Sequence, residues 1–156
     1  MNRLEVFGKM IDAFFEGSRI LYKYDKMPRK YGTDAELYMS EMHTLDIIYK
    51  NEGATVTSLA GITKKTKSAI TQFTNKLEKK GLIRKLRNDA NYKEINLFLT
   101  EQGKKTCIFH KSLDEEKFQN AIRYVKNYSV DDLQKCYEIF TIITHTMNKD
   151  ELGENK

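Results

Sequence analysis

Hydroxyl, carboxamide and cationic side chains are concentrated between positions 66 and 93 of the chain. Hydroxyl groups such as those of Thr66 and Ser68 can bond an oxyanion beside the free backbone N–H groups of a helix start. The carboxamides of Gln72 and Asn75 each pair a donor with an acceptor, which matches the edge of a nucleic-acid base. Nearby lysine and arginine side chains can contact phosphate oxygens or guanine. The complete candidate set is Thr66, Lys67, Ser68, Thr71, Gln72, Asn75, Lys76, Arg84, Lys85, Arg87 and Lys93.

The positive charge of the chain is confined to this same region. The formal net charge of all 156 residues is +5 at pH 7. Between Gly61 and Lys93, however, ten cations face only Glu78 and Asp89, so this window carries +8 and the rest of the chain −3. A local cationic patch is the electrostatic footprint expected for a polyanion partner. The alternative is that the lysines only form a solvated helix face.

A single amphipathic helix is predicted to carry most of the candidate residues. Its inward stripe has the helical spacing i, i+3, i+4, i+7 and consists of Ile70, Phe73, Thr74 and Leu77. Its outward face consists of Lys67, Ser68, Thr71, Gln72, Asn75 and Lys76. Thr66 is predicted to cap the start of the helix, and Gly81 is predicted to end it, because glycine adopts the left-handed cap conformation at little steric cost.

After Gly81 the period of the apolar residues changes from helical to alternating. The stretches "LIRKLR" and "EINLFLT" flank the turn-rich "NDANY" and predict a two-stranded hairpin. Upstream, a helix with Met42, Leu45 and Ile48 is predicted to stop near residues 51–53, and Thr57 is predicted to cap a short helix after it. Helix, turn, helix, glycine and basic hairpin, in this order, form a winged helix-turn-helix.

Long amphipathic helices are predicted at both ends of the chain. Apolar residues recur at helical spacing over residues 4–24 and 101–126, and Ser129 with Asp132 resembles a capping box before a final helix. A loop is predicted between the first two helices, around Pro28 and Gly32. The apolar seams predict that the ends of the chain pack together and against a second copy. The alternative is that they cover only the core of their own chain.

The sequence resembles the MarR family of bacterial transcriptional regulators. The resemblance rests on "VTSLAGITKKTKSAITQFTNKLEKKGLIRKLRN" and "INLFLTEQGKK". It implies a mainly α fold with a small β wing (α+β) in a single domain, residues 1–156. Within it, residues 36–100 form the DNA-binding lobe, and residues 1–28 and 101–150 form the dimerisation region. The implied function is that of a homodimer that binds a double-stranded DNA operator as a repressor relieved by an effector such as a small molecule.

Two positions depart from the family pattern. The turn between the two helices has Thr63 and Lys65 where relatives usually have apolar residues, so packing there is expected to be looser or to be taken over by Ile62. The wing tip reads Asn91, Tyr92, Lys93 in place of Asp-Arg-Arg. The resemblance implies that the amphipathic helix after Thr66 is the recognition helix. Because lysine cannot make the fork-shaped contacts of arginine, this helix is expected to contribute more than the wing.

Other functions have weaker support in the sequence. His43, Cys107 and His110 form an alternative, a metal-responsive regulator, since Cys107 and His110 are three residues apart on one helical face. A second alternative is a dimeric scaffold that binds nucleic acid or protein without sequence preference. No motif for catalysis, a bound cofactor, a signal peptide or a membrane span is present, so we expect a cytoplasmic protein that is not an enzyme. The operator, the regulated genes and the effector stay open.

Overall fold

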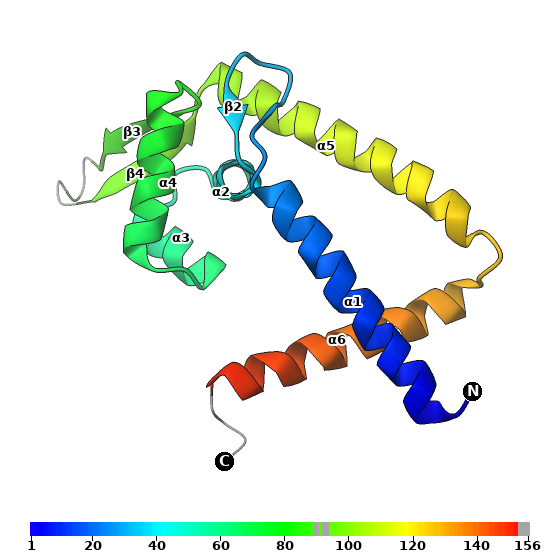
Figure 1. The fold of residues 1–156 in the computed structure, drawn as a ribbon. Coiled ribbons are helices and arrows are strands. Elements are labelled where there is room, and N and C mark those ends of the chain that lie inside the picture. The colour runs from blue at the N-terminus through cyan, green and yellow to red at the C-terminus, as the bar shows by residue number, and fades with distance from the viewer. Residues whose placement is uncertain (89–90, 92–93, 153–156) are drawn as a thin grey trace. The chain divides into compact units, whose positions relative to one another are not determined.

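The computed structural model describes residues 1–88, 91 and 94–152, with side chains described up to Met147. It contains helices and two short antiparallel sheets, so the predicted fold class, mainly α with a small β wing, is confirmed (Figure 1). The elements are α1 (Arg3–Asp25), β1 (Arg29–Lys30), β2 (Glu36–Leu37), α2 (Met39–Lys50), α3 (Val56–Thr63), α4 (Lys67–Lys79), β3 (Ile83–Arg87), β4 (Ile95–Leu99), α5 (Glu101–Ile122), a 3-10 turn (Arg123–Val125) and α6 (Val130–Leu152).

The chain divides into two compact units, Met1–Ser112 and Leu113–Lys156. The boundary lies inside α5, so the first turns of that helix belong to the first unit. The predicted single domain and its internal boundaries stay predictions. No helix within the described part of the chain is both long and apolar enough to cross a membrane.

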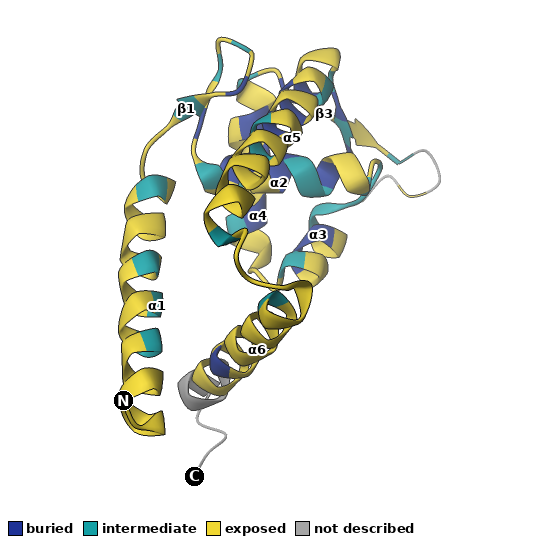
Figure 2. Cartoon of the chain, turned by 90° about the vertical axis from the view of Figure 1, so that its right-hand side faces the viewer, coloured by how far each residue is buried: buried dark blue, intermediate teal, exposed yellow. Residues whose placement is uncertain are grey.

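The core of the first unit surrounds α2. Leu45, Ile48, Leu59, Ile70 and Leu77 are all fully buried. They come from α2, α3 and α4, and each contributes on the order of 1.5–3 kcal/mol by leaving water. The wing adds the buried side chains of Leu82, Ile83, Leu97 and Leu99. Figure 2 shows this buried material gathered around α2, whereas α1 is largely exposed.

The α4 helix forms as the sequence predicts. Thr66 caps it, since its Oγ1 accepts a hydrogen bond from the Ala69 N–H at 3.2 Å. Gly81 follows the last turn with a φ of +70°, a left-handed conformation that costs a residue with a Cβ about 1 kcal/mol or more. Ile70, Thr74 and Leu77 are buried and line the inward stripe. The outward face is therefore presented to solvent on a rigid helix.

The wing is a hairpin in which Ile83 pairs with Leu99 and Arg87 with Ile95. It is joined to the turn between α2 and α3, because Gly53 N donates to Leu97 O at 2.8 Å and Leu97 N donates to Ala54 O at 3.0 Å. These bonds extend the hairpin into that turn. The predicted two-stranded hairpin is confirmed, and its position against the helices is fixed by backbone bonds.

Thr100 connects the wing to α5 and is the only residue between β4 and that helix. Its N–H donates to Leu82 O at 3.0 Å and its hydroxyl donates to Gly81 O at 2.7 Å. The same hydroxyl accepts from the Gly103 N–H at 3.1 Å. One threonine thus ties together the end of α4, the start of β3 and the first turn of α5.

Some local predictions are wrong. The cap of α3 is Thr55, whose Oγ1 accepts from Ser58 N–H at 3.1 Å, while Thr57 lies inside the first helical turn. The two residues have the same type, so only the backbone decides between them. The predicted loop around Pro28 and Gly32 contains the two-residue ribbon β1–β2. The helix predicted over residues 101–126 is continuous only to Ile122, where a 3-10 turn follows.

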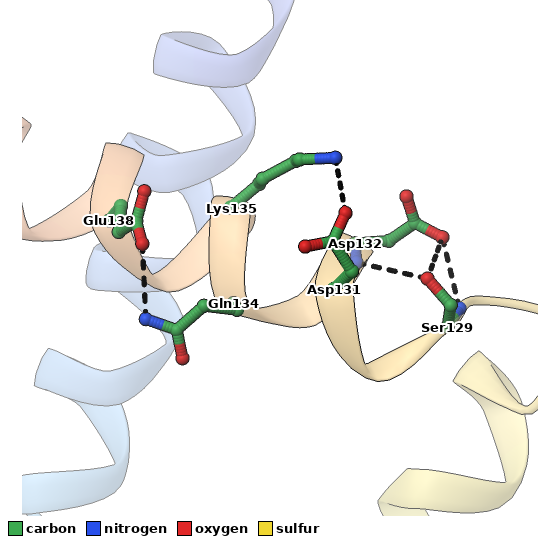
Figure 3. A network of polar contacts seen from close by, with 6 residues as sticks. All are labelled: Ser129, Asp131, Asp132, Gln134, Lys135 and Glu138. Carbon is green, nitrogen blue, oxygen red and sulfur yellow. Dashed lines mark hydrogen bonds and ion pairs between the residues drawn. The ribbon is translucent and has the colours of Figure 1, made fainter.

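In the second unit, the capping box predicted at Ser129 is confirmed (Figure 3). Ser129 Oγ accepts from Asp132 N–H at 3.1 Å, and the Asp132 carboxylate accepts from Ser129 N–H at 3.0 Å. These bonds from Ser129 lower the pKa of the Asp132 carboxyl. Farther along α6, Lys135 bonds Asp131 and Gln134 bonds Glu138. The opening of α6 is therefore fixed by its own polar side chains.

Candidate nucleic-acid interface

The outward face of α4 holds six of the predicted site residues together. Lys67, Ser68, Thr71, Gln72, Asn75 and Lys76 are all exposed. Thr71 donates its hydroxyl hydrogen to Lys67 O at 2.7 Å, and the hydroxyls of Thr66 and Ser68 lie 3.0 Å apart. These local bonds orient the hydroxyl groups, and the longer Gln72 and Lys76 side chains reach beyond them. The face carries side chains that can contact phosphates and side chains that can contact base edges.

Lys85 is held differently from the other cations of the site. Its Nζ lies 3.0 Å from Glu78 Oε2 and also donates to Asn75 Oδ1, and its side chain is only 17% exposed. The strand β3 alternates, so Lys85 lies on the same side as buried Ile83, facing α4, and Arg84 lies on the opposite side. Lys85 therefore links the wing to the recognition helix, with its charge paired.

The two arginines of β3 are exposed to solvent. Arg84 and Arg87 are exposed on β3, where their charge is free of the ion pair that holds Lys85. Near the tip, Asn88 N–H donates to Glu94 O at 3.0 Å and Glu94 N–H donates to Asn91 O at 2.8 Å. Lys93, which we predict as a site residue, and Tyr92 lie outside the described residues. The positive charge of the described wing is thus carried to solvent by arginine.

A second lysine of the basic window, Lys80, points inward. Its Nζ lies 2.6 Å from Oε2 of Glu41, a side chain that is almost fully buried, and 2.7 Å from Glu36 O. Glu41 also accepts from the Tyr38 N–H at 3.0 Å, where it closes a capping box at the start of α2. The end of the recognition helix is therefore anchored to α2 by a largely buried ion pair. No local pattern of the sequence predicts this pair, because its members are 39 residues apart.

The turn before α4 also differs from one expectation. Ile62 is 51% exposed, so it does not take over the packing of the turn. Thr63 instead donates its hydroxyl hydrogen to Leu59 O at 2.8 Å, and Lys64 adopts the left-handed conformation with a φ of 53°. The turn is held by backbone and hydroxyl bonds, and Lys64 and Lys65 remain exposed beside the start of α4.

The three residues of the metal alternative gather around a carboxylate. His110 Nδ1 lies 2.9 Å from Asp46 Oδ2, and the Cys107 thiol also bonds Asp46. The His43 ring lies 6.3 Å from the His110 ring, centre to centre. Burial raises the pKa of the Cys107 thiol to about 12, with a further contribution from Asp46, and burial also raises the pKa of Asp46.

These contacts form a hydrogen-bonded cluster centred on Asp46. The thiolate is the form of cysteine that binds metal, and a raised pKa keeps Cys107 protonated near neutral pH. Over the described stretches of the chain, no group of three or more histidine, cysteine, aspartate or glutamate residues is placed to hold a metal ion. Asp46 is the member of the cluster that was not predicted from the sequence.

The fold and the exposed basic face define a winged helix-turn-helix protein. The sequence model of the MarR family matches residues 37–95, which run from β2 to the start of β4. The resemblance drawn from the sequence is thereby confirmed over the winged helix-turn-helix part of the chain.

Relatives and solved structures are also similar to this chain. The chain is 27% identical over 115 residues to the HTH-type transcriptional regulator YhjH of Bacillus subtilis, an alignment that covers 74% of this chain and 66% of YhjH. FabT of Streptococcus pneumoniae, solved in complex with DNA, has a TM-score of 0.69 at 18% identity, covering 94% of this chain and 98% of FabT. ZitR of Lactococcus lactis, also solved with DNA, has a TM-score of 0.70 at 17% identity, covering 90% and 97%. At these identities, the two structures support the fold.

Proposed function

We propose that this protein is a homodimeric transcriptional repressor that binds duplex DNA at specific sites. In this proposal, α4 enters the major groove and the wing lies along the neighbouring backbone. An effector relieves repression by changing the separation of the two recognition helices. The DNA complexes of FabT and ZitR, which share the fold, support this reading.

The observation that carries the proposal is the coincidence of charge and reading chemistry on one rigid face. Gln72 and Asn75 occupy the outward side of α4, with Lys67 and Lys76 beside them and Arg84 and Arg87 on the adjoining strand. Carboxamides discriminate between bases, and the cations contribute affinity for any sequence through phosphate contacts. A lysine-rich face that served only for solvation would not require carboxamide side chains between the lysines.

The homodimer is supported by apolar side chains that the single chain leaves in water. In α1 of the first unit, Leu4, Ile20 and Leu21 are 78%, 59% and 65% exposed. In α6 of the second unit, Tyr137 and Ile142 are each 65% exposed. Exposed apolar surface of this kind marks an interface, and a second copy gives the two recognition helices that a pseudo-palindromic site requires.

Selection of bound sequences from a random duplex library tests the proposal. The expected result is one enriched motif with two half-sites whose centres are about one helical turn, or a multiple of it, apart. Binding without any enriched sequence would support the non-specific scaffold instead. Sedimentation velocity of the same sample should give twice the mass of the 18.3 kDa chain.

Salt dependence separates phosphate contacts from base contacts. Replacing Lys67, Lys76 or Arg87 by Met should weaken binding to all sequences and reduce the salt slope by about one per subunit. Lys135 provides the control, because it is an exposed lysine of α6 paired with Asp131. An unchanged slope in one of the three variants removes that residue from the interface.

A further inference from the structure

Asn75 of α4 accepts a hydrogen bond from Lys85 of the neighbouring strand β3. Asn75 and Glu78 are three residues apart on α4, so they lie on one side of the helix. Lys85 reaches both of them from the neighbouring strand, with Nζ donating to Asn75 Oδ1 and lying 3.0 Å from Glu78 Oε2. Three side chains from two elements thus form one group held by an ion pair and a hydrogen bond.

The chemistry of lysine fixes the orientation of the Asn75 carboxamide. An ammonium group has three donors and no acceptor, so the atom of Asn75 that faces it must be the oxygen. The amide NH2 group then points away from Lys85. Asn75 itself is exposed, so this NH2 group is available to a partner in the groove. The free side of Asn75 therefore offers hydrogen-bond donors.

Hydrogen-bond donors on the free side of Asn75 discriminate between adenine, guanine and cytosine. Adenine presents an acceptor and a donor in the major groove, and its bidentate recognition by asparagine needs both the oxygen and the NH2 group. Guanine presents two acceptors, N7 and O6, and cytosine presents a donor. Because the Asn75 oxygen is turned toward Lys85, the NH2 group on the free side matches the two acceptors of guanine better than the acceptor and donor of adenine, and it opposes the donor of cytosine.

We propose that Lys85 is a positioning residue that makes Asn75 select guanine over adenine at one position of each half-site. This inference rests on the proposed function, since it requires that α4 read DNA. It also separates Lys85 from the phosphate-contacting cations. Its ammonium is paired with Glu78, and its side chain is 17% exposed.

The experiment compares base preferences after library selection. Wild-type protein should prefer guanine at one position per half-site, and Asn75→Ala should lose that preference, which identifies the position. Lys85→Met with Glu78→Gln removes the ammonium without leaving an unpaired carboxylate beside the DNA. In that variant the carboxamide can turn, and the guanine-to-adenine ratio should fall about tenfold, within the range of one bidentate contact.

Three further variants check the mechanism. Glu78→Gln alone keeps the bond from Lys85 to Asn75 and should retain the guanine preference, as should Lys85→Arg, which also has only donors. Asn75→Asp places a carboxylate oxygen on the free side and should shift the preference toward cytosine, whose N4 group donates. This last variant leaves Lys85 and Glu78 in place and tests whether residue 75 faces a base, even if the double variant does not fold.

The outcomes are distinguishable. A wild-type selection without an enriched motif overturns the proposed function and this inference with it. An enriched motif in which the Asn75 position prefers adenine, or in which no position depends on Asn75, overturns the inference and leaves the function standing. A uniform loss of affinity in the double variant, with a lower salt slope and an unchanged base ratio, identifies Lys85 as a phosphate contact and also overturns it.

Discussion

Removing the lysine that neutralises Glu41 should destabilise the first unit of the chain. The Glu41 side chain is 2% exposed and the Lys80 side chain 28%, and Nζ lies 2.6 Å from Oε2. Removing one partner of a buried ion pair costs about 3–5 kcal/mol, because the other charge is left without compensation. Lys80 is partly accessible and Glu41 keeps its bond from Tyr38 N–H. Lys80→Met should therefore cost near the low end, about 3 kcal/mol.

Urea unfolding followed by circular dichroism measures this cost. All variants are compared at one protomer concentration, since the stability of a dimer depends on it. For a chain of this length, the loss corresponds to a melting temperature lower by about 6–12 °C. Lys79→Met is the matched control, because Lys79 is an exposed neighbour on the same helix, and it should change stability by no more than about 0.5 kcal/mol.

A double variant separates the lost ion pair from lost packing. Lys80→Met combined with Glu41→Gln leaves no buried charge, and the glutamine can still accept from the backbone at the start of α2. The double variant should therefore be more stable than Lys80→Met alone, with a coupling of about 1–3 kcal/mol. If Lys80→Met costs no more than Lys79→Met, or if the two changes simply add, the reasoning about the buried pair is refuted.

Three further outcomes are expected. Gly103→Ala should cost on the order of 3 kcal/mol in the same urea assay, because its Cβ would lie 2.0 Å from Leu82 O, whereas Gly61→Ala meets nothing within 4 Å and should be neutral or slightly stabilising; equal effects would contradict the close approach of α5 to the wing. Thr55→Ala should cost about 1 kcal/mol and Thr57→Ala much less, since only Thr55 accepts from Ser58 N–H; the reverse order would restore Thr57 as the cap. Cys107 should resist iodoacetamide at pH 8 until the protein unfolds, because its pKa is raised to about 12 and the thiolate is the reactive form; with Cys136→Ser as the background, rapid labelling of native protein would show that the thiol is accessible and ionised.

The recognition helix and the wing were predictable because each depends on a local pattern. The inward stripe of Ile70, Thr74 and Leu77 repeats at helical spacing, and Gly81 marks the change to alternation. Such signals need only the neighbouring residues of the chain. The cap of α3 was missed because Thr55 and Thr57 are equally suitable side chains, and only the fold selects one of them.

The interior of the site was not predictable from local patterns. From the sequence alone, Lys80 and Lys85 are two more cations of the basic window. In the structure, Lys80 is paired with Glu41 of α2 and Lys85 with Glu78 of α4. Each pairing depends on which elements become neighbours in the fold. The same holds for Asp46, which bonds the side chains of Cys107 and His110 on a helix far along the chain. Long-range neighbours therefore decide which charged groups face solvent.

The joint at Thr100 has a mechanical consequence. Bonds from this residue reach Gly81 and Leu82 at one end and Gly103 at the other, so torque applied to the first turn of α5 arrives at helix and hairpin together. These bonds favour rotation of helix and hairpin as one unit. If the protein binds DNA as proposed, a small rotation of this unit would misalign the contacts of α4 and of the wing together, so that release would be abrupt.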